Sequence, residues 1–193
     1  MKYKNIKIKP ACAGRKYTTG FTLVESLVAI SILSMSILST YTAVQNSLQS
    51  SSIAKDRIVA FYLAQEGMEY IKNIRDENAL HAIAGIPTNW LHGLSEVAGD
   101  PCYFGKVCKV DSQAKVASFC GNAFNTCPVL NQNSSSGLFG YASGGNWVVT
   151  NFKREIQFAQ NSVNEIAVTI SISWTTKGTT KSFQVKQLLF NRQ

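Results

Sequence analysis

Residues 20–41 have the sequence Gly-Phe-Thr-Leu-Val-Glu-Ser-Leu-Val-Ala-Ile-Ser-Ile-Leu-Ser-Met-Ser-Ile-Leu-Ser-Thr-Tyr, and this stretch decides the fold. No charged residue occurs from Ser26 to Ala54. That run exceeds the ~20 residues that a helix needs to cross the core of a bilayer. Its serines lower the hydrophobicity, but a serine hydroxyl can bond to a carbonyl of its own helix or to a neighbouring helix. The stretch therefore predicts a membrane helix.

The helical pattern continues beyond the apolar run. Charged residues alternate with apolar ones at helical spacing as far as Asn78, and no proline occurs between Phe21 and Ile86. We therefore expect one helix from about residue 22 to 78, about 85 Å long at about 1.5 Å per residue. Its first half is apolar all round and its second half is amphipathic, which indicates a domain packed on the second half. The apolar positions of that half are Ile53, Ala60, Leu63, Ala64, Met68, Ile71 and Ile74.

The C-terminal residues 147–193 predict an antiparallel sheet. Between Ile166 and Thr175 apolar residues alternate strictly with small ones, which gives a strand one buried face and one wet face. Similar alternation occurs upstream of this segment, where Arg154 interrupts the apolar face. It also occurs downstream, and Lys177-Gly178 is expected to form the hairpin turn that connects the last two strands. The expected fold class is α+β, in which a sheet of three or four strands packs on the second half of the long helix.

The segment between helix and sheet, residues 79–146, is rich in Gly, Pro, Asn and Ser and predicts loops with at most a short helix or strand. It holds Cys102, Cys108, Cys120 and Cys127, whose spacing lacks the Cys-x2-Cys pairs of structural zinc sites. Outside the cytoplasm, four clustered cysteines indicate two disulfides, and three pairings are possible. We expect neither a metal nor a cofactor.

The positive charge is concentrated ahead of the apolar run. Without the six basic residues of positions 1–20, the 19 basic residues of the chain fall to 13, nearly balanced by 11 acidic ones. Lys and Arg hold their end of a membrane segment in the cytoplasm, so topology explains the formal charge of +8. Nucleic acid is not indicated as a partner. The six residues are Lys2, Lys4, Lys7, Lys9, Arg15 and Lys16.

The sequence from Gly20 to Glu25, preceded by this basic leader, resembles the cleavage and methylation motif of type IV pilins and type II secretion pseudopilins. The resemblance covers about residues 14–45 and implies a pilin-like fold. It implies cleavage after Gly20 and N-methylation of Phe21 by a prepilin peptidase/methyltransferase, and a role for Glu25 in subunit assembly. The other implied partners are pilin subunits bound through the N-terminal helix, the inner-membrane assembly platform and the cytoplasmic membrane.

Glu25 fits this interpretation physically, because it is the only charged residue between Lys16 and Lys55. A carboxylate in a membrane helix costs at least ~2.5 kcal/mol on insertion scales and usually marks function. Cleavage would give Phe21 a positive amine one helical turn away. In a filament, that amine can pair with Glu25 of a neighbouring subunit, and the penalty for a lone partner would set the register.

These observations divide the chain into a leader (1–20), a transmembrane and filament-core half of the helix (21–52) and an extracytoplasmic globular domain (53–193). The domain contains the cysteine-bearing loop region, 79–146, and the strand region, 147–193. We expect a single-pass precursor in the cytoplasmic membrane with its leader in the cytoplasm, and later a cell-surface filament.

Three functions remain open. The first is a structural subunit of a type IV pilus, specifically a minor pilin, because Thr42 stands where many major pilins have a helix-breaking proline. The second is a pseudopilin of a type II secretion system. The third, of another class, is a membrane-tethered adhesin that does not polymerise and uses loop aromatics such as Trp90 and Tyr103.

Other classes are disfavoured. An ordinary signal peptide needs a small-x-small cleavage site after the apolar run, and Tyr41 spoils the candidate that ends at Ala43. An enzyme is not expected, because His81 and His92 offer no dependable base-and-acid partnership and no phosphate-binding glycine motif occurs. The role of the filament, whether adhesion, motility, DNA uptake or secretion, is left open.

Overall fold

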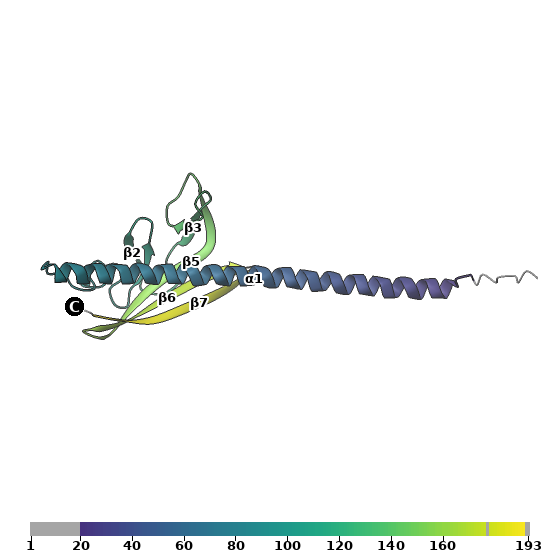
Figure 1. The fold of residues 1–193 in the computed structure, drawn as a ribbon, viewed down its shortest axis with the longest axis horizontal. Helices are drawn as coiled ribbons and strands as arrows, with labels where there is room; N and C mark the ends of the chain where they lie inside the picture. Colours follow the sequence, from purple (N-terminus) through teal and green to yellow (C-terminus); the bar gives the residue numbers. More distant parts are fainter. Residues whose placement is uncertain (1–19, 177, 192–193) are drawn as a thin grey trace, which may run out of the picture. The chain divides into compact units, whose positions relative to one another are not determined.

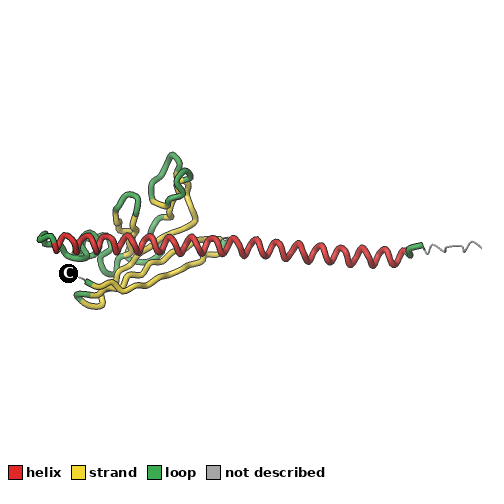
Figure 2. Tube along the Cα trace, in the orientation of Figure 1, coloured by secondary structure: helices red, strands yellow, loops and turns green. Residues whose placement is uncertain are grey.

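The computed structural model describes residues 20–176 and 178–191. The chain divides into two compact units, Met1–Ser50 and Ser51–Gln193. Helix α1, Leu23–Ile83, contributes its first part to one unit and the remainder to the other (Figures 1 and 2). The long N-terminal helix is thus confirmed, and it ends five residues beyond the expected position 78. The expected leader, except for Gly20, lies outside the described residues.

The described part of the second unit contains a seven-stranded antiparallel sheet (Figure 1). The sheet order is β2-β1-β5-β3-β4, and β6 extends it by pairing with β5 and with β7. The strands are β1 (Val107–Asp111), β2 (Val116–Gly121), β3 (Val129–Asn133), β4 (Phe139–Gly140), β5 (Trp147–Ser162), β6 (Glu165–Thr176) and β7 (Thr179–Phe190).

The sheet is larger than the expected three or four strands, because β1 to β4 form within the segment expected to be mostly loops. These four strands are short, two to six residues each, so their alternation is too brief to stand out from the surrounding Gly, Pro and Asn. They are ordered by pairing: β1 and β3 both pair with the long strand β5. A 16-residue strand thus supports partners that the local sequence alone does not specify.

The three C-terminal strands form the expected meander. In β5 and β6, Ile156 pairs with Ile170 and Phe158 with Val168. β6 and β7 pair along their whole length and close at Gly178, whose φ of 78° suits a residue without a side chain. The hairpin partner expected at Lys177 lies outside the described residues.

The core lies between α1 and one face of the sheet. Five of the seven apolar positions expected to face the domain are buried, whereas Ile53 and Ile74 are half-buried. The loop after α1 adds Trp90, which is only 5% exposed, so this residue is not part of an exposed aromatic surface. Tyr103 is half-buried. The five buried positions are Ala60, Leu63, Ala64, Met68 and Ile71.

Arg154, which interrupts the apolar face of β5, is fully buried. Its Nη1 donates to the carbonyl of Leu63 at 3.1 Å and to Glu66 Oε2 at 3.0 Å. Its Nη2 donates to the carbonyl of Val110 at 2.8 Å. A buried charge is tolerated when it is paired and hydrogen-bonded. The guanidinium therefore links β5 to α1 and to β1.

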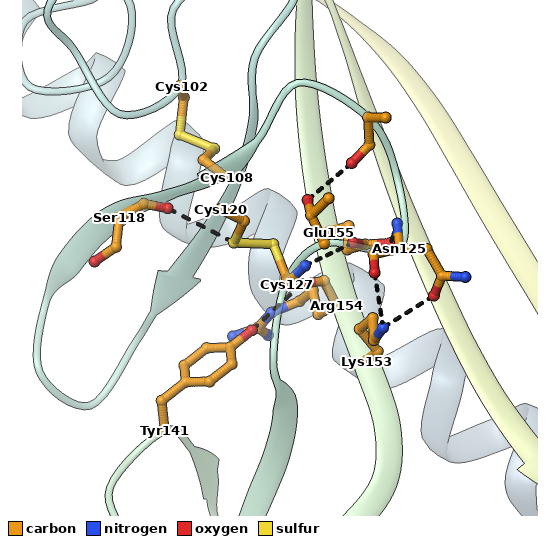
Figure 3. The surroundings of a disulfide bond; sticks show 12 residues. Cys102, Cys108, Ser118, Cys120, Asn125, Cys127, Tyr141, Lys153, Arg154 and Glu155 are labelled. Atoms are coloured by element: carbon orange, nitrogen blue, oxygen red, sulfur yellow. Dashed lines mark hydrogen bonds between the residues drawn. A yellow bond between two sulfur atoms is a disulfide. The ribbon is translucent and has the colours of Figure 1, made fainter.

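Two disulfides hold the chain around the short strands (Figure 3). Cys102 bonds to Cys108, with their Cα atoms 5.1 Å apart, and Cys120 bonds to Cys127, with their Cα atoms 4.9 Å apart. Of the three pairings left open by the sequence, this is the one that joins neighbours along the chain. Each disulfide closes a small loop, at the start of β1 and after β2.

The second disulfide loop surrounds a buried carboxylate. Glu155 on β5 accepts hydrogen bonds from the backbone N–H groups of Asn125, at 2.8 Å, and Cys127, at 3.0 Å (Figure 3). Beside it, Lys153 Nζ donates to Asn125 Oδ1 at 2.9 Å. The backbone N–H groups of the loop closed by Cys120 and Cys127 therefore supply the hydrogen bonds that the buried Glu155 side chain cannot obtain from water.

Candidate processing and assembly site

The candidate cleavage bond lies just ahead of helix α1. Thr22 caps the helix, because the N–H of Glu25 donates to Thr22 Oγ1 at 3.2 Å and the N–H of Ser26 to the Thr22 carbonyl at 3.1 Å. Gly20 and Phe21 precede the helix and are exposed, Phe21 to 72%. The Gly20–Phe21 peptide bond is therefore outside the helical hydrogen bonds and open on the surface of the first unit.

Glu25 lies in the first turn of α1, three residues after the capping threonine. An acidic residue is favourable here, because the free N–H groups of a helix start carry partial positive charge. Its side chain is exposed, and its carboxylate forms no hydrogen bond or ion pair with the residues that the structure describes. The carboxylate is thus available to a partner from another molecule.

The serines of the apolar run bond to their own helix. The hydroxyl groups of Ser31, Ser34 and Ser36 donate to carbonyls four residues earlier, at 2.8, 2.8 and 2.9 Å. A hydroxyl satisfied in this way can lie among apolar groups without the cost of an unpaired donor. The expectation that serine is compatible with this helix is confirmed.

The rest of the helix in the first unit presents apolar side chains that no described residue covers. Leu23, Ile30 and Met35 are 83%, 62% and 70% exposed. α1 is long and apolar enough to cross a membrane, with an 18-residue window of mean hydropathy 1.8, none of it buried. Apolar surface this extensive needs lipid or other helices around it.

The structure places Gly20, Phe21 and Glu25 together at the start of α1, while the four cysteines belong to the second unit. Sequence reasoning missed the capping role of Thr22. Its signal was present: a threonine followed three residues later by glutamate, ahead of an apolar run, marks a helix N-terminus.

The two histidines considered as catalytic or metal-binding candidates are exposed. His92 Nδ1 lies 2.6 Å from Glu96 Oε2 on the surface, and His81 is in the last turn of α1. Among residues 20–176 and 178–191, no group of three or more His, Cys, Asp or Glu side chains could hold a metal ion.

Comparison with known proteins gives one match, at the N-terminal end of the chain. Residues 15–41 match the family model described as the prokaryotic N-terminal methylation motif. This motif is the signature of type IV pilins and pseudopilins, so the chain carries a prepilin-type N-terminus, and the long apolar helix fits it. Searches of the curated proteins and of the solved structures give no match.

Proposed function

We propose that the chain is a structural subunit of a type IV pilus, a minor pilin that is cleaved after Gly20 and N-methylated at Phe21 before assembly. One observation carries the proposal: the methylation motif lies at the capped start of a helix whose apolar surface is uncovered. The motif accounts for processing, and the uncovered helix accounts for both the membrane stage and the filament stage.

Hydrolysis of the Gly20–Phe21 bond leaves a new amine on Phe21 and a carboxylate on the released leader. The amine is positive, and methylation preserves its charge. Inside a bundle of apolar helices, an unpaired amine and an unpaired Glu25 carboxylate are both penalised by desolvation. The amine of one subunit therefore pairs with Glu25 of another, which fixes how far neighbouring helices are displaced along their axes.

The basic leader holds the N-terminus of the precursor in the cytoplasm, where the membrane-bound peptidase/methyltransferase acts. The inner-membrane assembly platform then transfers the mature subunit from lipid to the helical core of the filament. Lipid and a bundle of apolar helices are similar environments for the uncharged run, so this transfer exposes little apolar surface to water. The role is structural rather than catalytic.

A pseudopilin of a type II secretion system is the second candidate, and one feature favours both candidates over a major pilin. α1 continues without interruption through Thr42, whose Oγ1 donates to the Ser39 carbonyl at 2.9 Å. A proline in the helix interior would break hydrogen bonds there. The adhesin alternative has less support, because Trp90, one of its two proposed contact residues, is in the core.

Mass spectrometry of the mature chain tests the processing step. We expect the first residue to be N-methylated Phe21 and residues 1–20 to be absent. A chain that begins at Met1, or at any residue other than Phe21, would overturn the proposal.

The polymerisation step is tested by Glu25→Gln, which keeps the size of the side chain and removes its charge. The variant should be processed and inserted in the membrane but lost from sheared surface filaments. Glu69→Gln, which changes an exposed carboxylate of the second unit, is the matched control and should be incorporated normally. Normal incorporation of Glu25→Gln would overturn the pairing of Glu25 with the amine of a neighbouring subunit, whereas absence of the wild-type chain from all filaments would support a tether that does not polymerise. Recovery of the wild-type chain in surface filaments distinguishes a minor pilin from a pseudopilin.

A further inference from the structure

The second unit has a cavity whose donor groups lack acceptors. Arg57 on α1 and Trp174 on β6 line a cavity of about 350 Å³ together with Ser182 and Phe183 of β7. The exposed guanidinium of Arg57 forms no hydrogen bond or ion pair with the described residues. The buried Nε1 of Trp174 has no acceptor among them either. The cavity therefore fits a group that accepts hydrogen bonds and carries negative charge.

The charges around this cavity leave its basic groups available. Lys55, Asp56 and Arg57 are the only charged residues from Ser26 to Gln65. The carboxylate of Asp56 accepts a hydrogen bond from the hydroxyl of Thr176 at 3.0 Å. Lys55 is exposed and, like Arg57, has no ion pair within residues 20–176 and 178–191. Two cations are thus open to an anion from another molecule.

Apolar and aromatic side chains lie beside Arg57 on α1. Ile58, Phe61 and Tyr62 are 57%, 52% and 64% exposed. The ring of Phe61 lies 6.2 Å from the ring of Phe183, which lines the cavity, so the apolar surface and the cavity are continuous. Aromatic rings and basic side chains with long apolar stems are both favoured where a membrane meets water.

The length of the uncharged run explains why this surface lies at a membrane. Residues 26–54 form a helical stretch about 43 Å long at about 1.5 Å per residue. A bilayer with its headgroups is about 40–45 Å thick. With Glu25 at the cytoplasmic surface, Lys55 and Arg57 reach the headgroups of the other leaflet. Side chains on a helix also lean towards its N-terminus, which for α1 is the membrane side.

We propose that Arg57 and the cavity beside Trp174 bind the phosphate of a phospholipid headgroup on the outer face of the cytoplasmic membrane, with Ile58, Phe61 and Tyr62 in the same interface. The second unit is then held on the membrane surface as well as tethered through α1. Assembly must break this contact when it extracts the subunit. This inference rests on the membrane-anchored stage of the proposed function and needs no filament.

Photo-cross-linking tests the contact in the full chain, reconstituted in nanodiscs of phosphatidylethanolamine and phosphatidylglycerol. The photoreactive residue p-benzoylphenylalanine in place of Ile58 should give an adduct with the mass of one phospholipid. The same residue in place of Val97, which is 56% exposed in the loop after α1, should give none. Equal capture of lipid at both positions, or capture of a second copy of the chain instead of lipid, would overturn the inference.

Substitution of Arg57 separates recognition of the phosphate from mere closeness to lipid. With the photoreactive residue at position 58, Arg57→Gln should reduce the lipid adduct about fivefold, the effect of one basic residue at an anionic membrane surface. Arg57→Lys keeps the charge and should retain most of the adduct. Lys115→Gln, which changes an exposed cation in the turn between β1 and β2, is the matched control and should have no effect.

The outcomes distinguish this inference from the proposed function. Undiminished lipid capture in Arg57→Gln, or none in the wild-type background, would overturn the headgroup site and leave processing at Gly20 and assembly through Glu25 intact. Failure of the wild-type chain to insert in bilayers would overturn both.

Discussion

Arg154 Nη1 lies 3.0 Å from Glu66 Oε2, so the only ion pair that joins the described part of α1 to the sheet involves a fully buried arginine. The Glu66 side chain is 33% exposed, and its other oxygen accepts a hydrogen bond from the hydroxyl of Ser112. The carbonyl of Arg154 accepts from the hydroxyl of Tyr141 at 3.3 Å, and burial raises the pKa of Tyr141 to about 12, so this phenol stays protonated as a donor. The guanidinium of Arg154 thus joins α1 and β1 to β5, and the main-chain carbonyl of the same residue binds Tyr141.

Replacing Glu66 and replacing Arg154 should lower the free energy of unfolding by different amounts. Glu66→Ala leaves the buried guanidinium without its counter-charge and should lower the free energy of unfolding by about 3 kcal/mol. Arg154→Met removes the charge and keeps most of the volume, and Glu66 can then be hydrated, so its cost should be smaller. Denaturant unfolding of the detergent-solubilised chain, followed by tryptophan fluorescence, measures both. A larger loss for Arg154→Met would contradict this account.

Gly67 lets the Arg154 side chain cross the helix. A Cβ at this position would lie 3.2 Å from Arg154 Cδ and 3.4 Å from Ile170 Cδ1. Gly67→Val should therefore destabilise the domain by about 1–3 kcal/mol through overpacking. Gly67→Ala is the control: its gain of about 1 kcal/mol in helix propensity offsets much of the close contact. Equal thermal midpoints for the Val and Ala variants would show that Arg154 does not need this space.

The two disulfides should contribute unequally although their loops are similar, with sequence separations of 6 and 7. Loop entropy assigns each about 2–3 kcal/mol. Replacing Cys120 and Cys127 by alanine also loosens the N–H groups that solvate Glu155, so this double variant should lose more stability than the one lacking Cys102 and Cys108. Adding Glu155→Gln should remove most of the difference in unfolding midpoint. A difference that persists in that background would exclude the carboxylate as its cause.

The contribution of the Thr22 cap to the stability of the start of α1 should be measurable. Thr22→Ala removes the acceptor for the Glu25 N–H and should cost the helix terminus about 1 kcal/mol. Hydrogen exchange at the Glu25 amide should then become faster, by about fivefold for that free energy. Thr22→Ser restores an acceptor and should exchange as the wild type does. Unchanged exchange in Thr22→Ala would mean that another group caps this helix.

The sequence was sufficient for the parts of the fold with long, regular periodicity. The run after Gly20 and the amphipathic pattern up to Asn78 predicted α1, and the alternation from Ile166 to Thr175 predicted β6 with its neighbours. The candidate site could also be predicted from a short segment, because Gly20, Phe21 and Glu25 lie within six positions. The methylation-motif family model matches the segment that contains them.

What the sequence could not predict depends on pairings between distant residues. β1 to β4 are ordered through β5 and the disulfides, and the spacing of the four cysteines left three pairings open. The sequence showed Arg154 only as an interruption of the apolar face of its strand. Its burial and its hydrogen bonds could not be predicted, because the partners Leu63 and Glu66 are far away in the sequence. Burial of Trp90 likewise follows from tertiary packing on α1 rather than from its loop composition.

The pairing of neighbouring cysteines has a consequence for biogenesis. A chain exported with its N-terminus retained delivers Cys102, Cys108, Cys120 and Cys127 to an oxidising compartment in that order. If each thiol pairs with the next one to emerge, the products are the native bridges. A thiol oxidase alone is then sufficient, and no isomerase is needed to correct misjoined intermediates. The domain can be covalently complete before β5, the strand that organises its sheet, has left the translocation channel.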